Sequence, residues 1–191
     1  MAADLGASGH EVHASARDVI DYWFALTTEE QFGKDADRDA EIGRRFGDLR
    51  EHLLANEADG WRSDANRMLA AIIVLDQFSR NIHRGSPEAF AADDLAVQLT
   101  LEAVRAGFDL EVTPERRAFL YMPLMHAEHL GLQRYAIALF EEAGLDEQVR
   151  FARDHADVIA GYGRFPHRND VLGRESSPAE LDYLSQPDAG W

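Results

Sequence analysis

Apolar residues recur every three or four positions along almost the whole chain, which is the spacing that gives an α-helix one buried face. No segment alternates apolar and polar residues between turn signals, as a half-buried strand would. Short joints containing Gly or Pro separate the helical stretches, so neighbouring helices should run antiparallel. We therefore expect an all-α domain of about eight helices.

The start of several expected helices is marked by an N-cap residue followed by proline, as at Ser86-Pro87, Thr113-Pro114 and Ser177-Pro178. Ser15 with Asp18, and Ser177 with Glu180, have the spacing of capping boxes. The run MLAAIIVL at 68–75 is apolar on all sides, so the helix that contains it should be central and buried. Pro123 lies within a later helix and should kink it. The expected ranges are 16–26, a helix with an apolar stripe over 42–53, 65–82, 86–107, 113–131, 133–143, 146–160 and 177–184.

The chain has 191 residues, which fits one domain with a core large enough to fold without covalent or metal staples. It contains no cysteine, and this excludes disulfides and thiolate metal sites. The first residues have neither the cationic start nor the apolar run of a secretory signal. We expect residues 1–15 to be a flexible leader, 16–186 a single helical domain and 187–191 a C-terminal tail.

The sequence carries 35 acidic and 19 basic residues, a formal net charge of −16. A surface this acidic repels phosphate backbones and anionic lipids, so we expect neither a nucleic acid nor a membrane as partner. The longest apolar run is far shorter than the roughly 20 residues that cross a bilayer. These features predict a soluble, cytoplasmic protein, and they predict no oligomeric state.

Three segments place polar side chains on helix faces that should be buried, and the first is DQFSRNIHR at 76–84. Asp76 and Arg80 stand four residues apart, as do Arg80 and Arg84, so each pair shares a helix face. One interpretation is an ion pair at a helix end, with arginines that complement the helix dipole. The other is a half-buried Asp76 that requires Arg80 as a fixed partner.

The other two segments contain histidines. In YMPLMHAEH at 121–129, His126 and His129 lie one turn apart and Glu128 points elsewhere, so we expect no metal site. His155 shares a stripe with Phe151 and Val158 and should face inward, either bonding a carbonyl group or exchanging a proton.

The segment YGRFPHRND at 162–170 cannot continue a helix, because glycine frees the backbone and the residue before Pro166 is held extended. The expected result is an ordered loop that presents cationic side chains near the start of the last helix, where anions are favoured. The partner of these side chains is either a bound anion or an internal carboxylate, namely Asp76, Glu128 or Asp170.

The blocks DVIDYWF, DQFSRNIHRG, YMPLMHAEH and HADVIAGYGRFPHRNDVLGRESSPAELDYL resemble, in this order, the bacterial domain-of-unknown-function family 924 over residues 17–184. The resemblance implies an all-helical fold similar to tetratricopeptide-repeat superhelices and no established activity. By position, the polar signature of the family falls on Asp76, Gln77, Arg80, Asn81, Arg84, His126, Glu128, His155, Arg164, His167, Arg168, Asn169 and Arg174.

These observations lead to three hypotheses about function. In the first, a pocket binds a small anionic molecule or an acidic peptide end through Arg80, Asn81, Arg84, His126, Arg164, His167, Arg168, Asn169 and Arg174. In the second, the protein is a hydrolase or transferase whose acid–base residues come from Asp76, Glu128 and His155, with or without a divalent metal. In the third, the polar residues form a purely structural clasp. The sequence identifies no cofactor.

Overall fold

The computed structural model describes residues 9–187 and 189–190, and within them all regular secondary structure is helical. This confirms the expected all-α fold. None of the described helices is long and apolar enough to cross a bilayer. The first half of the chain forms α1 (Gly9–Ala25), α2 (Thr28–Phe32), α3 (Ala36–Ala55), α4 (Ala65–Ile73), the π-helical turn η1 (Val74–Phe78) and α5 (Ser79–Ile82). The remaining elements are the 3-10 turn η2 (Pro87–Phe90), α6 (Asp93–Ala106), the 3-10 turn η3 (Phe108–Glu111), α7 (Pro114–His126), α8 (Leu130–Glu142), α9 (Asp146–Tyr162), the 3-10 turn η4 (Pro166–Arg168) and α10 (Pro178–Leu184).

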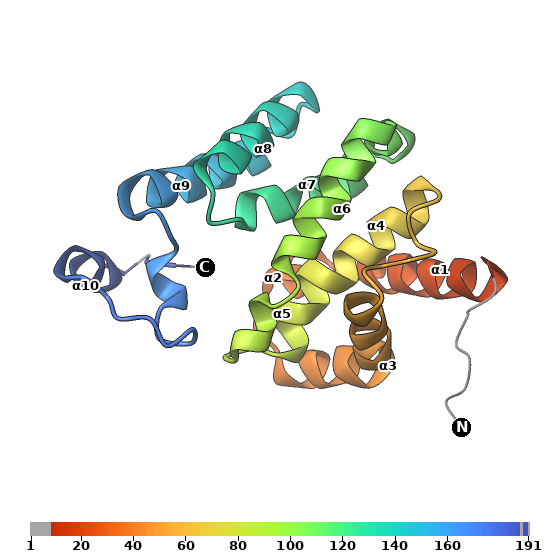
Figure 1. The fold of residues 1–191 in the computed structure, drawn as a ribbon, viewed down its shortest axis with the longest axis horizontal. Helices are drawn as coiled ribbons and strands as arrows, with labels where there is room; N and C mark the ends of the chain where they lie inside the picture. The colour runs from red at the N-terminus through yellow and green to blue at the C-terminus, as the bar shows by residue number, and fades with distance from the viewer. Residues whose placement is uncertain (1–8, 188, 191) are drawn as a thin grey trace.

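Helix α4 is the centre of the N-terminal half, as its apolar sequence predicts. It packs against α1, α6 and α7, and its extension η1 packs against α3 (Figure 1). Trp23, Phe46 and Phe78 form an aromatic cluster between these helices, with ring centroids 4.8 to 5.6 Å apart for the Phe46–Phe78 and Trp23–Phe78 pairs. Edge-to-face and offset aromatic pairs stabilise a core beyond the area that they bury.

The C-terminal half continues as adjacent helices, with α8 packed between α7 and α9 (Figure 1). After α9 the chain leaves helical structure, forms η4 and then begins α10 at the predicted capping box of Ser177 and Glu180. The chain end returns to this loop, since Gly190 at φ +91° lies where an added Cβ would be 2.9 Å from the Cβ of His167. Residues 163–177 are called here the late loop. They lie between α10 and the end of α7.

The structure corrects several expected boundaries. Helix α1 begins at Gly9, so Ser15 is inside the helix and does not cap it, while residues 1–8 of the expected leader lie outside the described residues. Residues 188 and 191 of the expected tail are outside them as well. The helix expected at 113–131 ends at His126, one turn after Pro123, and Gly131 lies in the first turn of the next helix. The helix expected at 86–107 is a 3-10 turn followed by α6.

The helix expected at 65–82 is interrupted by the π-helical turn η1. A π-turn accommodates one extra residue, and such turns occur frequently at functional sites. In η1 the side chains of Asp76 and Gln77 are buried. The central helix therefore carries its one carboxylate within an irregular turn.

Candidate functional site

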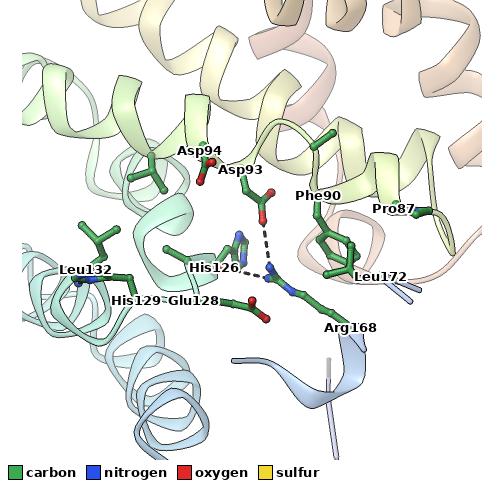
Figure 2. Close-up of a pocket in the computed structure, with 13 residues that line it drawn as sticks. Pro87, Phe90, Asp93, Asp94, His126, Glu128, His129, Leu132, Arg168 and Leu172 are labelled. Atoms are coloured by element: carbon green, nitrogen blue, oxygen red, sulfur yellow. Dashed lines mark hydrogen bonds and ion pairs between the residues drawn. The ribbon is translucent and has the colours of Figure 1, made fainter. Parts of the chain in front are cut away.

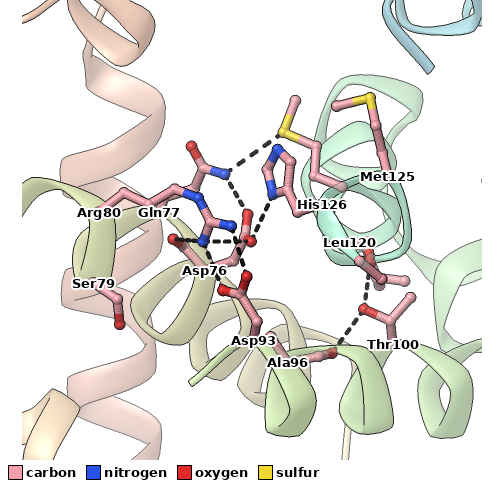
Figure 3. Close-up of polar contacts among 12 residues, drawn as sticks. Asp76, Gln77, Ser79, Arg80, Asp93, Ala96, Thr100, Leu120, Met125 and His126 are labelled. Carbon is pink, nitrogen blue, oxygen red and sulfur yellow. Dashed lines mark hydrogen bonds and ion pairs between the residues drawn. The ribbon is translucent and has the colours of Figure 1, made fainter. Parts of the chain in front are cut away.

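Asp76 is the centre of the polar site. Its side chain is only 1% exposed, and it pairs with Arg80 at 3.0 Å and with Nδ1 of His126 at 2.7 Å (Figure 3). Gln77 donates a further hydrogen bond to Oδ2. This confirms the expectation that a carboxylate directly after the apolar run needs Arg80 as a fixed partner, and it adds His126, fifty residues later in the chain.

Asp76 determines the tautomer of His126. Burial alone would raise the pKa of Asp76, but the positive charge of Arg80 and the contact with His126 outweigh burial and hold the pKa well below its usual range. An ionised carboxylate accepts hydrogen bonds only, so Nδ1 of His126 must carry the hydrogen atom. The neutral ring then has its lone pair on Nε2, which lies on the side of the ring away from Asp76 (Figure 3).

Asp93 extends this cluster to the late loop. It accepts two hydrogen bonds from Arg80, at 3.0 and 3.1 Å, and one from Arg168 Nη1 at 3.2 Å. Arg168 also donates to the backbone carbonyl of His126 at 3.0 Å (Figure 2). Its guanidinium lies 4.5 Å from the ring centroids of both Phe90 and Phe165. The late loop thus reaches the Asp76 cluster through Asp93, which Arg80 at the end of the central helix also binds.

Glu128 fastens the late loop at a second point. It accepts bonds from Arg174 at 2.7 and 2.9 Å and from the backbone N–H of Phe165 at 2.7 Å. Burial raises the pKa of Glu128, but the bonds from Arg174 and Phe165 lower it more, so the carboxyl group stays ionised. Of the internal partners considered from the sequence, Glu128 is therefore the one that holds Arg174.

The other predicted residues belong to separate clusters. Arg164 donates two bonds to Glu180, at 2.6 and 2.8 Å, and Asn169 bonds Ser176 and Arg174 within the late loop. Arg84 and Asn81 both bond Asp39 on α3. The nine residues expected to bind one anion therefore do not line a single pocket. Arg80, Arg84, Arg164, Arg168 and Arg174 each pair with a carboxylate of the protein.

His155 is buried, as predicted, and its Nδ1 lies 2.7 Å from the carbonyl oxygen of Phe151. Its ring lies beside those of His126 and Phe165, with centroids 6.0 and 5.6 Å away. Burial and the neighbouring His126 lower the pKa of His155 to about 3. Phe151, expected on the same inward stripe, is exposed instead.

Lowering the pH from 7 to 4 is expected to destabilise the protein through the buried His155 and the half-buried His167. Burial and Arg168 lower the pKa of His167 to about 4, while His155 titrates at about 3. In the unfolded chain both groups titrate near 6.5. Between pH 6.5 and the lower pKa of the folded protein, the unfolded state binds more protons, so the free energy of unfolding decreases as the pH decreases. Each group contributes a slope of up to about 1.4 kcal/mol per pH unit. Urea unfolding between pH 4 and 7 should therefore give a shallower slope for His155→Phe, and equal slopes would contradict this assignment.

A pocket of about 490 Å³ opens beside the Asp76–His126 pair. Its polar lining comes from α6, from the joint between α7 and α8 and from the late loop, and its apolar lining includes Phe90, Leu132 and Leu172 (Figure 2). The polar and charged lining residues are Asp93, Asp94, His126, Glu128, His129 and Arg168. Within the described residues, no group of three or more histidine and acidic side chains has the arrangement of a metal site.

Four partners of the arginines were not predicted from the sequence: Phe90, Asp93, Asp39 and Glu180. Asp93 is the first residue of α6, where an acidic side chain is explained by the helix dipole alone. Glu180 was recognised only as part of a capping box, although it also binds Arg164. Nothing in the local sequence indicated a second partner for either carboxylate.

The fold and this site together define a class of all-α protein, in which a late loop is held by arginine–carboxylate pairs beside a His–Asp pair at the end of the central helix. The family model described as "Bacterial protein of unknown function (DUF924)" matches residues 19–188. The chain therefore belongs to this family, as the sequence blocks suggested. It is also similar to the solved structure of a protein of unknown function, ATU0120 from Agrobacterium tumefaciens. The two chains share 38% sequence identity and align with a TM-score of 0.87. The alignment covers 91% of this chain and 98% of the other. No curated protein matches the chain.

Proposed function

We propose that the pocket beside Asp76 and His126 is an acid–base site, in which Nε2 of His126 exchanges a proton with a bound small molecule or with a water that attacks it. This corresponds to the enzymatic hypothesis, a hydrolase or transferase. The observation that carries it is the 2.7 Å contact between His126 and a buried, ionised Asp76 at the wall of a 490 Å³ pocket. A carboxylate that orients an imidazole and stabilises its protonated form is the arrangement used in general acid–base catalysis.

The other two candidate acid–base residues support this role less well. Glu128 is bound by Arg174 and by a backbone N–H group, so three of its roughly four lone-pair sites are already used. His155 is buried against the Phe151 carbonyl, and a group with a pKa of about 3 is a poor base near neutral pH. His126 is half-buried, since 15% of its side chain is exposed, and it lines the pocket.

The hypothesis of an anionic ligand has less support from the geometry. It requires arginines with free guanidinium groups, whereas Arg168, the arginine that lines the pocket, donates one Nη to Asp93 and the other to a carbonyl oxygen. The structural clasp has direct support, because the same pairs join the late loop to the rest of the chain. A clasp and an acid–base site are compatible, since the clasp also holds the pocket wall in place.

The first test needs no substrate. The ¹⁵N shifts of the His126 ring should show hydrogen on Nδ1 and a bare Nε2 in the neutral form, and Asp76→Asn should disturb this preference. Diethyl pyrocarbonate, which acylates accessible unprotonated imidazole nitrogens, should modify His126 before His155. A hydrogen atom resident on Nε2 of the neutral ring would refute the proposal, because that nitrogen could then accept no proton.

The second test measures turnover of p-nitrophenyl esters, p-nitrophenyl phosphate and amino-acid p-nitroanilides. Any activity at this site should fall by about a hundredfold in His126→Gln, because a positioned acid–base group typically contributes at least that much. His52→Gln is the matched control, since His52 is a half-buried histidine in the last turn of α3 and does not line the pocket. Activity that survives in His126→Gln would place the chemistry elsewhere.

A further inference from the structure

We propose that the ligand of this pocket carries a positively charged hydrogen-bond donor, an ammonium or guanidinium group on an aliphatic chain, and that Asp94 binds it. The inference rests on the proposed function of the pocket and specifies the chemical class of its ligand. It is opposite in sign to the anionic ligand that the arginine-rich sequence suggests. Four observations support it: the balance of charge, the state of Arg168, the position of Asp94 and the remaining lone pairs.

The buried charges around the pocket already balance without a ligand. Asp76 is paired with Arg80, Asp93 with Arg80 and Arg168, and Glu128 with Arg174. Three carboxylates thus face three guanidinium groups. An anion entering this site would meet no uncompensated positive charge, and the overall charge of −16 would oppose its approach.

Arg168 is the cation nearest to the pocket, and its charge is already engaged by the protein. Both Nη atoms donate to protein oxygens, and the Phe90 and Phe165 rings lie against the guanidinium. Burial and the nearby Arg80 lower the pKa of Arg168 to about 10, and the neighbouring carboxylates of Asp93 and Glu128 partly offset this effect. An anion that bound the Nη groups of Arg168 would have to break one of the pairs that hold the late loop, and the Nε–H, which has no hydrogen-bond partner in the described part of the chain, is buried.

Asp94 differs from the other three carboxylates. It lines the pocket next to Asp93 in the first turn of α6, and its side chain is exposed (Figure 2). Across residues 9–187 and 189–190, no hydrogen bond or ion pair engages its carboxylate. Asp94 is therefore the uncompensated charge among the acidic residues of the lining, and that charge is negative.

The remaining polar atoms of the lining also favour a donor. In the neutral ring the Nε2 lone pair of His126 is an acceptor, and so are the oxygens of Asp94, so a ligand with hydrogen-bond donors satisfies both. A charged N–H donor binds the Asp94 carboxylate more strongly than a hydroxyl group does. His129 accepts the Leu132 N–H at Nδ1, so its Nε2 hydrogen adds one neutral donor at the rim. Pro87, Phe90, Val97, Leu132 and Leu172 supply apolar surface for a hydrocarbon chain. A small aliphatic amine or a basic side chain matches this combination.

The test uses three probes of similar length and different charge: 1,4-diaminobutane, butane-1,4-diol and succinate, each titrated at constant ionic strength. Binding is followed by calorimetry and by the ring signals of His126. We expect 1,4-diaminobutane to bind and to shift the His126 signals, and Asp94→Asn to weaken this binding about tenfold, as the loss of a charged hydrogen bond does. Asp157→Asn, an exposed acid on α9 away from the pocket, should leave it unchanged and so controls for the general acidity of the surface.

Three results would overturn the inference: tighter binding of succinate than of the diamine at His126, diamine binding that Asp94→Asn leaves unchanged, or no shift of the His126 signals with any probe. The variant His126→Gln separates this inference from the proposed function. If it keeps the Asp94-dependent binding of the diamine and the ¹⁵N experiment finds hydrogen on Nε2, the ligand class stands and the acid–base role fails. If the ring has a bare Nε2 but succinate is the ligand that binds, the acid–base role stands and the ligand class fails.

Discussion

Replacing Asp76 with alanine is expected to lower the free energy of unfolding by about 3–5 kcal/mol, the usual cost of removing one partner from a buried ion pair. The carboxylate is 1% exposed and is contacted by Arg80 and His126 together, so its removal leaves two polar groups without their buried partner. Arg80 keeps Asp93, but Nδ1 of His126 loses its acceptor. Urea unfolding at pH 7 gives the value directly.

Glu41→Ala is the matched control for this variant. Glu41 is also an acid four residues from an arginine, Arg45, but both side chains are 44% exposed, and an exposed pair contributes less than about 1 kcal/mol. The pH dependence gives a second check. Because the folded pKa of Asp76 is below the ordinary value of about 3.9, its contribution is fully present above that pH and is lost as the pH falls further. Equal losses for the two variants at pH 7 would show that Asp76 is not an energetically important buried charge.

The sequence predicted the fold largely through periodicity and capping residues. The run at 68–75 became the buried centre, and Ser177 and Glu180 formed the expected capping box, because both signals depend on residues close together in the chain. The π-helical turn at 74–78 was not predicted, since VLDQF fits regular helical spacing and the extra residue is accommodated only by packing against α3 and α6. The early start of α1 was also not predicted, and neither was the short α2, although the capping box of Thr27 and Glu30 at its start is a local signal.

The site was predicted in outline, but the charge partners were predicted only in part. Asp76–Arg80 lies within one helical turn and could be recognised from spacing. Internal carboxylates could be named from the sequence as possible partners of the late loop, and Glu128, which binds Arg174, was among them. The pairing of Arg168 with Asp93 could not be inferred, because the two residues are seventy-five positions apart in the chain. An ion pair between distant segments depends on the packed structure and leaves no local sequence pattern. Each of the five arginines expected to bind an anion pairs with a carboxylate of the protein. The pocket therefore lacks the free positive charge that the sequence suggested.

Replacing Arg168 with alanine is expected to lower the free energy of unfolding by about 3 kcal/mol and to loosen the late loop, because a buried cation with two polar partners and two aromatic neighbours is removed. The backbone hydrogen bonds of residues 166–174 are local to the late loop, so side chains of Arg168, Arg174 and Glu128 make its polar connections to α6 and to the α7–α8 joint. Hydrogen exchange of the amides in 163–177 should therefore increase more than exchange in α4.

Arg150→Ala provides the baseline, since Arg150 is 75% exposed and lies 4.0 Å from Glu147, and its removal should cost less than about 0.5 kcal/mol. A double-mutant cycle with Asp93→Asn isolates the contact itself, for which we expect a coupling of about 1–2 kcal/mol, within the range found for residues that share one network. Arg168→Lys should recover only part of the loss, because lysine keeps the charge but cannot bond Asp93 and the His126 carbonyl in one plane between two rings. If Arg168→Ala matched Arg150→Ala in stability and left the exchange of the late loop unchanged, then the loop would be held by other contacts and the pocket wall would not depend on the arginine clasp.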